Sequence, residues 1–332
     1  MKAAIGETID NETLGGATTH SEISGVTDNT FDSDEACLDY IKSVMSTLGE
    51  TPKAGFDRIE AVAPQANPDE LYGSFPEDRT KPYDVKEVLD RIVDQGSFNE
   101  YKALYGKTIV CGSARIDGWA VGIVANQRKM VKTKKGEMQM GGVIYSDSAD
   151  KAARFIMNCN QRKIPLVFLQ DVSGFMVGSR AEQGGIIKDG AKMVNAVSNS
   201  VVPKFTIITG NSYGAGNYAM CGKAYDPRFI FAWPTAKIAV MSGSAAANTL
   251  LQIKISTEKA KGNEVSEEDK EQLLSDITKK YNDKLSPYYA ASRLWIDGII
   301  DPMDTRKVLS SSIEAANHAP IEETFNVGVI QT

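Results

Sequence analysis

The sequence predicts an α/β fold in which short buried strands alternate with helices from about residue 83 onward. Apolar runs such as residues 165–170 are typical of strands buried on both faces of a parallel sheet. Several strands run directly into glycine-rich turns that open a helix, above all in residues 205–220. In such folds, ligand sites form at the carboxyl ends of the strands.

The elements before residue 130 follow from local patterns. Residues 34–48 predict a helix with Leu38, Ile41 and Leu48 on one stripe and an N-cap at Asp32, Ser33 or Asp34. Residues 51–79, rich in Pro, Asp and Glu, predict a linker. Residues 85–94 predict a short helix, and strands 108–114 and 120–126 pair across the Asp117–Gly118 turn.

Beyond residue 130 the alternation becomes regular. The patterns predict strands at 165–170, 204–209, 229–233 and 237–241. They predict helices at 148–162, 181–198, 244–256 and 304–316, and a further helix that begins within 216–221. The strongly charged stretch 259–284 predicts a solvated helical excursion.

Composition excludes several classes of function. A net charge of −6 and a pI near 5.2 disfavour nucleic acid or an anionic membrane as the main partner. The four cysteines form no C-x-x-C pair, so we expect no zinc module or other metal site, and a reducing cytoplasm. No apolar run approaches the ~18 residues of a membrane span. Two histidines nearly exclude chemistry that needs a histidine cluster.

The turn after residue 209 allows three interpretations. Residues 214–219 match the dinucleotide pattern G-x-G-x-x-A, but no carboxylate stands at the end of the next strand, near Trp233, so NAD binding is disfavoured. Gly210-x-Ser212-x-Gly214 matches a nucleophile elbow, with Asp297 or Asp301 and then His318 in the order of a hydrolase triad. The third interpretation, in which backbone N–H groups polarise a carbonyl, best fits the scarcity of histidine.

Residues 169–178 form a second glycine-containing turn between a predicted strand and a predicted helix. Asp171 at its start is either a base or an Asx-turn former, and the turn continues through Gly174 and Phe175. Three glycines in the following predicted helix, Gly184, Gly185 and Gly190, indicate tight packing on the sheet or room for a ligand. A third small-residue turn at 241–247 suggests a spiral of repeated strand–strand–helix units.

Taken together, these segments resemble the carboxyltransferase subunits of biotin-dependent acyl-CoA carboxylases. The matching strings are SGFMVG at 173–178, GIIKDGAKM at 185–193, SYGAGNYAMCG at 212–222, AYDPRF at 224–229, AWPTAK at 232–237, VMSG at 240–243 and DGIIDPMDTR at 297–306. The strings around Gly174 and Gly214 are most similar to the methylcrotonyl-CoA carboxylase branch. Tyr218 stands where propionyl-type members usually carry Asp.

The resemblance implies a crotonase-like ββα spiral, built in this family as an N-lobe and a C-lobe. Residues 82–332 would form the carboxyltransferase C-terminal lobe, and residues 1–80 would be the tail of an N-lobe plus a linker. The C-lobe receives carboxybiotin, and the N-lobe receives acyl-CoA. By the same resemblance, the N–H groups of Ala215 and Gly216 form the hole for the biotin ureido oxygen, and Gly174, Phe175 and Gly214 lie along the biotin pocket.

The resemblance also implies partners: a biotin carboxyl carrier, a biotin carboxylase subunit, an N-lobe, and further copies of this chain that share active sites. Three alternatives stay open at this point. The chain could serve a biotin-dependent acyl-CoA decarboxylase, which runs the same half-reaction backwards. It could be a serine acyl hydrolase that uses Ser212, or a non-catalytic assembly subunit.

Overall fold

The computed structural model describes residues 5–76, 81–262 and 265–330, and its contacts divide the chain into two compact units. Unit 1 is Met1–Pro52 and unit 2 is Lys53–Thr332. The predicted division near residue 81, between an N-lobe tail and a C-lobe, stays a prediction.

Unit 1 is helical. It contains α2 (Asn11–Gly15), a π-helical turn (Thr19–Ile23) and α3 (Asp34–Thr47). The Ser33 side chain caps α3 by accepting a hydrogen bond from Ala36 N at 3.1 Å, which confirms the predicted helix and one of its proposed caps. The described residues of unit 1 include none that is buried, so its apolar stripe forms no core within the unit.

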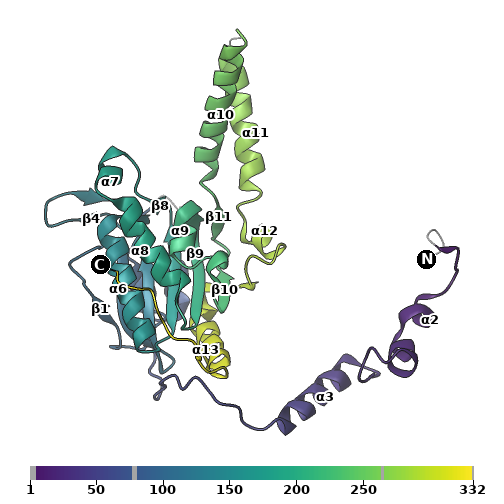
Figure 1. Cartoon of the computed structure of the whole chain (residues 1–332). Coiled ribbons are helices and arrows are strands. Elements are labelled where there is room, and N and C mark those ends of the chain that lie inside the picture. The colour runs from purple at the N-terminus through teal and green to yellow at the C-terminus, as the bar shows by residue number, and fades with distance from the viewer. Residues whose placement is uncertain (1–4, 77–80, 263–264, 331–332) are drawn as a thin grey trace. The chain divides into compact units, whose positions relative to one another are not determined.

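Unit 2 is built on a mixed sheet whose strands, in spatial order, are β1 (Asn99–Tyr101), β2 (Ile109–Ile116), β3 (Trp119–Asn126), β7 (Leu166–Val172), β9 (Lys204–Tyr213), β10 (Phe229–Ala232) and β12 (Gly298–Ile299) (Figure 1). β1, β2 and β3 pair antiparallel, and the others pair parallel. Asp117 and Gly118 both have positive φ, as a two-residue type I′ hairpin requires, so the predicted hairpin is confirmed.

Helices cover both faces of the sheet. α6 (Ser146–Gln161) and α8 (Ile186–Ser198) pack on one face over Ile109, Val124 and Phe168. α5 (Val85–Leu89) and α13 (Thr305–Asn317) pack on the other face over Val121 and Phe205. The sheet is therefore buried on both sides, which explains its apolar strands and confirms the predicted α/β class.

Short elements gather where the parallel strands end. β6 (Val143–Ile144) pairs with β8 (Gly174–Phe175), β11 (Lys237–Ala239) pairs with the end of β9, and β4 (Val131–Lys132) pairs with β5 (Met138–Gln139). α7 (Ser179–Gln183) and α9 (Gly214–Ala219) follow β8 and β9 in the chain. These elements form the strand-end region in which the sequence predicts a site.

The remaining described elements are α4 (Leu71–Ser74), α10 (Gly243–Ala260), α11 (Glu267–Asn282), α12 (Pro287–Ala291) and 3₁₀ turns at Pro68–Glu70, Lys223–Tyr225 and Pro302–Asp304. α10 and α11 lie side by side as a helical hairpin (Figure 1). α11 carries the predicted charged excursion on its exposed surface.

Two predicted elements are wrong. The helix predicted at 181–198 breaks into α7 and α8 because Gly185 has a φ of +92°, outside the helical range. The linker predicted at 51–79 packs instead: Phe56, Leu71 and Phe75 are buried in the core of unit 2. These widely spaced apolar residues stand in a stretch whose Pro, Asp and Glu content hides them. Residues 77–79 of that prediction lie outside the described residues.

Lys151 on α6 leads to a prediction about stability. Its side chain is fully buried, and its Nζ has no hydrogen-bond partner among the residues that the structure describes. Burial lowers the pKa of Lys151 from its ordinary value of 10.5. We expect Lys151→Met to raise the free energy of unfolding by about 1–3 kcal/mol at neutral pH, because a buried polar group without a partner is costly.

The lowered pKa of Lys151 also makes the stability of the protein depend on pH. Between the lowered folded pKa and 10.5, the unfolded chain binds more protons, so wild-type stability rises with pH in that window. Lys151→Met should lack this rise, while the exposed Lys307→Met control should keep it and stay within about 0.5 kcal/mol of wild type. Urea unfolding at several pH values measures both, and an unchanged slope in Lys151→Met would contradict the assignment.

Within the described ranges, no helix is long and apolar enough to cross a membrane. The same residues contain no cluster of three or more His, Cys, Asp or Glu side chains that could hold a metal ion.

Candidate active site at the strand ends

The turn between β9 and α9 requires glycine. Gly214 has a φ of +51°, and a methyl group added there would lie 2.9 Å from the backbone carbonyl oxygen of Val240. Tyr213 is the N-cap of α9, so Gly214, Ala215 and Gly216 occupy the first turn of the helix. The N–H groups of a first turn have no acceptor within their own helix, which makes them available to an oxygen atom of a ligand.

The two predicted glycine-rich turns meet. A Cβ at Gly216 would lie 3.1 Å from Gly174 Cα and 2.6 Å from a methyl group of Val172, so α9 rests directly on β8 and the end of β7. Gly174 itself has a φ of +138°, with open space where its Cβ would project. Glycine at both positions therefore allows a backbone-to-backbone approach beside an open face.

Phe175 explains one of the helix glycines. A Cβ at Gly190 of α8 would lie 2.8 Å from the Phe175 ring, so the ring packs directly against the helix backbone. Gly190 thus serves tight packing, the first of the two roles expected from the sequence. This packing fixes β8, and with it Gly174, against the sheet-covering helix.

A buried polar network holds α9 in place. Ser212 Oγ donates to Gln170 Oε1 at 2.6 Å and accepts from Asn217 Nδ2 at 2.7 Å. Gln170 Nε2 in turn donates to the Met220 carbonyl oxygen at 2.6 Å. The network ties the middle of α9 and its C-cap to β7 and β9, which restrains the short helix that follows the turn.

This network argues against the Ser212 hydrolase. The Ser212 hydroxyl is buried between two amide side chains, and neither amide can take its proton as a base. His318 is exposed at the C-cap of α13, and a carboxylate oxygen of Asp297 accepts a hydrogen bond from Ile230 N at 2.7 Å. Ser212 is therefore a positioning residue.

Asp171 is a structural anchor of the strand ends. One carboxylate oxygen accepts from Asn211 N at 2.9 Å, and the other accepts from the Tyr83 hydroxyl at 3.0 Å. Arg128 Nε lies 3.6 Å from the second oxygen, and both charged side chains are almost fully buried. The carboxylate thus clamps β9 to β7 through residues distant in the chain, a role that differs from both the Asx turn and the base expected from the sequence.

The three buried cysteines of unit 2 are protonated thiols at neutral pH. Burial raises the pKa of Cys111, Cys159 and Cys221 to about 12. Cys221 follows α9 directly, but its sulfur is fully buried. A thiolate nucleophile is therefore absent from these three positions at neutral pH.

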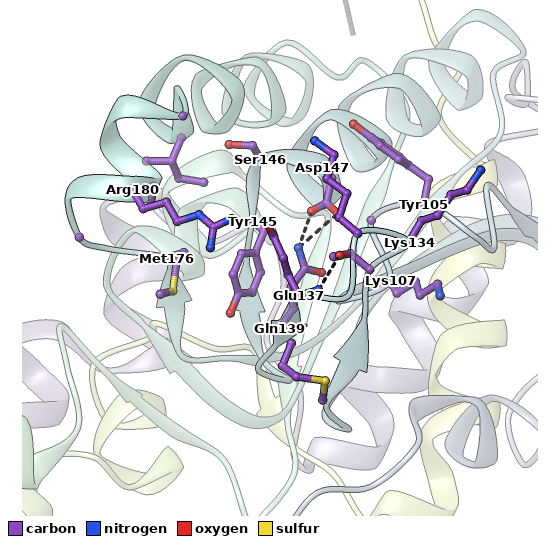
Figure 2. Close-up of a pocket in the computed structure, with 18 of the residues that line it drawn as sticks. Tyr105, Lys107, Lys134, Glu137, Gln139, Tyr145, Ser146, Asp147, Met176 and Arg180 are labelled. Atoms are coloured by element: carbon purple, nitrogen blue, oxygen red, sulfur yellow. Dashed lines mark hydrogen bonds and ion pairs between the residues drawn. The ribbon is translucent and has the colours of Figure 1, made fainter.

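A pocket of about 800 Å³ adjoins the second glycine-rich turn, whose residues Met176, Val177 and Gly178 line it (Figure 2). One wall begins at Met176, the residue after Phe175, and continues through α7. The lining also includes Tyr145 and Asp147 at the start of α6, and Gln139 of β5 donates to both carboxylate oxygens of Asp147 at 3.3 Å. The volume lies within the range of sites that hold drug-sized ligands.

Tyr218 covers the exposed side of α9. It follows Gly214 by four residues and Ala215 by three, so it shares their helix face, and helical side chains lean toward the N-terminus. Its half-exposed ring packs edge-on against Tyr225, with ring centroids 5.9 Å apart. The ring thus contacts the 3₁₀ turn at Lys223–Tyr225, which follows α9 in the chain.

The structure brings the sequence-predicted residues Gly174, Phe175, Gly214, Ala215 and Gly216 into one region. The roles assigned to them stay predictions. Sequence reasoning missed the far wall of the pocket, formed by residues 104–107 and 133–139. A signal was available, since Met and Lys repeat through residues 129–140, a pattern more typical of an interaction surface than of a sheet core.

Comparison with known proteins decides the family. The family model described as the carboxyl transferase domain matches residues 1–327. The chain belongs to the carboxyl transferase domain family. This membership confirms the resemblance seen in the sequence.

Relatives of this carboxyl transferase domain include acyl-CoA carboxylase subunits. The chain is 46% identical over 97% of its length to the biotin-dependent 3-methylcrotonyl-coenzyme A carboxylase beta1 subunit of Mycobacterium tuberculosis. It is 45% identical over 98% of its length to the mitochondrial methylcrotonoyl-CoA carboxylase beta chain of Arabidopsis thaliana. The matches cover 58% and 54% of those relatives, so the chain spans little more than half their length.

Solved structures of the family share the fold. The beta subunit of geranyl-CoA carboxylase from P. aeruginosa superposes with a TM-score of 0.77 at 36% identity, over 98% of this chain and 59% of that one. The transcarboxylase 12S subunit, solved as a hexamer with hydrolysed methylmalonyl-coenzyme A bound, gives a TM-score of 0.67 at 36% identity, over 95% and 57% of the two chains. The predicted crotonase-like α/β fold is confirmed.

Proposed function

We propose that the chain is the carboxybiotin-binding part of a carboxyltransferase that moves a carboxyl group between biotin on a carrier protein and an acyl-CoA thioester. The observation that carries the proposal is the approach of Gly216 to Gly174, which fixes the first turn of α9 beside the open face of Gly174. Family membership and the names of the relatives support the chemistry.

The residues present fit a biotin ring. Open space over Gly174 leaves room for the ring, which a Cβ there would narrow. The missing side chains of Gly214 and Gly216 let α9 pack closely on Val240, Val172 and Gly174, beside that space. Biotin would supply the carboxyl group to be transferred and a ureido oxygen on which negative charge develops as that group leaves. Gly174, Phe175 and Gly214 would line the ring, and Ala215 and Gly216 would face the oxygen.

The chain's own contribution is electrostatic. The N–H groups of Ala215 and Gly216 would donate to the oxygen in a position fixed by the Ser212–Gln170–Asn217 network. Donors that are aligned in advance cost no reorganisation during the reaction, and each is worth about 3 kcal/mol in comparable sites. The proposal requires no side-chain nucleophile, which agrees with the buried Ser212 hydroxyl and the protonated thiols.

Substrate and partners follow from the relatives. We propose a methylcrotonyl-type acyl-CoA as substrate, bound mainly by an N-lobe, and a biotin carboxylase subunit that charges the carrier. We also propose that copies of the chain associate, as in the hexamer of the transcarboxylase 12S subunit. The described cysteines are all free thiols, which favours a reducing compartment such as the cytoplasm.

Isotope exchange tests the function. The chain is combined with a biotinylated carrier, the N-lobe of a relative and a panel of acyl-CoA thioesters, and radiolabelled carboxyl is followed between biotin and thioester. We expect exchange with at least one branched acyl-CoA. A correctly assembled complex that exchanges no label with any thioester would refute the proposed activity.

Tyr218 should influence the choice of acyl group. We expect Tyr218→Asp to lower transfer to methylcrotonyl-CoA relative to propionyl-CoA by about tenfold or more, because loss of an apolar wall is worth roughly 1–3 kcal/mol of discrimination. Tyr218→Phe keeps the ring and its contact with Tyr225, so its ratio should stay near wild type. The ratio of kcat/KM for the two thioesters measures this effect, and equal ratios in all three proteins would exclude Tyr218 from selectivity.

A further inference from the structure

The rim of the pocket carries an excess of positive charge. Lys107, Lys134, Lys135 and Arg180 line it, against only two carboxylates, Glu137 and Asp147. Glu137 pairs with Arg180, and Asp147 accepts from Gln139. The carboxylates of the pocket therefore do not neutralise the three lysines. The rim is positive although the chain as a whole has a net charge of −6.

The same rim exposes large apolar side chains. Leu104 is 89% exposed, Val177 is 73% exposed and Met138 is 56% exposed, and all three line the pocket. Apolar groups gathered around a depression mark an interaction site rather than ordinary surface. Methionine adapts its shape to a partner, and the lysines would steer an acidic one.

We propose that this rim, formed by the β4–β5 hairpin, the loop before β2 and the start of α7, docks an acidic face of the biotin carrier domain. This inference rests on the proposed function, because Met176, which lines the pocket, directly follows Gly174 and Phe175 in the chain. A tethered biotin that reaches the glycine turns through this pocket brings its carrier onto the rim.

The distribution of charge favours a protein over a free phosphate ligand. The lysines of the hairpin, Lys134 and Lys135, are exposed, while the polar groups at the start of α6 include the carboxylate of Asp147. A carboxylate in the pocket repels phosphate, but it tolerates the neutral arm of biotinyl-lysine. The exposed apolar side chains need a partner that is large enough to cover them.

The test compares two lysine pairs of the full chain. The double variant Lys134→Glu/Lys135→Glu, the rim pair, reverses the charge of the rim. The double variant Lys279→Glu/Lys280→Glu, the α11 pair, makes the same change in charge on the exposed surface of α11. Affinity is measured for a biotinylated carrier domain from a biotin-dependent acyl-CoA carboxylase and, separately, for biocytin, the free biotinyl-lysine.

We expect the rim pair to weaken carrier binding by about tenfold or more and to reverse the sign of its salt dependence, because salt then screens repulsion. Biocytin affinity should stay unchanged, and the α11 pair should change neither affinity. Val177→Ser should also weaken carrier binding without altering charge. Equal losses in both lysine pairs, or displacement of the carrier by coenzyme A that binds at the rim lysines, would overturn the inference. Unchanged carrier affinity in the rim pair would do the same.

The docking inference and the proposed function fail in different ways. If the wild-type chain binds biocytin but the rim pair still binds the carrier normally, only the docking surface is refuted. If the wild-type chain binds neither biocytin nor the carrier, the proposed function and the docking surface both fail.

Discussion

Gly216→Ala should lower carboxyl transfer by about 10²–10³-fold in the reconstituted complex. The added methyl group would lie 2.6 Å from a Val172 methyl and 3.1 Å from Gly174 Cα, so α9 must move away from β8. That movement displaces the N–H groups of Ala215 and Gly216, and the loss of one such donor costs about 10²–10³ in kcat. The exchange assay measures the effect directly.

A matched substitution separates this effect from a general loss of stability. Gly73→Ala in α4 adds the same methyl group where no atom lies within 4 Å and φ is ordinary, so its activity should equal wild type. We expect Gly216→Ala to cost about 1–3 kcal/mol of stability by overpacking and to stay folded, as circular dichroism would verify. A folded Gly216→Ala protein with wild-type exchange would show that these N–H groups are not the donors.

Asp171→Leu should lower the free energy of unfolding by about 3–5 kcal/mol. It removes the carboxylate that faces Arg128 and leaves Asn211 N and the Tyr83 hydroxyl without this acceptor. Breaking a buried charged pair by removing one partner leaves the other charge uncompensated, which has a cost of this size. Urea unfolding followed by fluorescence measures the change.

Two further variants give the comparison for Asp171. Asp171→Asn keeps a carbonyl oxygen for Asn211 N, so its loss of stability should be smaller than that of Asp171→Leu. Glu314→Leu removes an exposed carboxylate from α13 and should change stability by no more than about 0.5 kcal/mol. If Asp171→Leu and Glu314→Leu are equally stable, Asp171 does not anchor the strand ends.

Much of the site was predictable from the sequence because it depends on backbone conformation. Gly214 and Gly174 stand at strand ends, and their positive φ angles are what glycine in such a turn indicates. The contact between the two turns, through Gly216 and Gly174, was not predictable from spacing, because it depends on the parallel pairing of β7 with β9. Only the family resemblance suggested that both turns line a common pocket.

The failures also have physical causes. Phe56, Leu71 and Phe75 look like isolated apolar residues in a polar stretch, and only the fold shows that they fill one side of the core. The Ser212 motif matches a nucleophile elbow, but a motif does not reveal that Gln170 and Asn217 occupy both sides of the hydroxyl. Long-range partners decide both cases, and local patterns do not contain them.

Amide NMR tests the central claim most directly, because the sequence contains only two Ala–Gly pairs, Ala54–Gly55 and Ala215–Gly216. Labelling alanine carbonyl carbons with ¹³C and glycine nitrogens with ¹⁵N therefore selects the amides of Gly55 and Gly216 alone. On titration with biocytin, we predict a saturable downfield shift of the Gly216 amide proton while Gly55 stays unchanged. Saturable binding of biocytin that leaves the Gly216 amide unmoved would contradict the account.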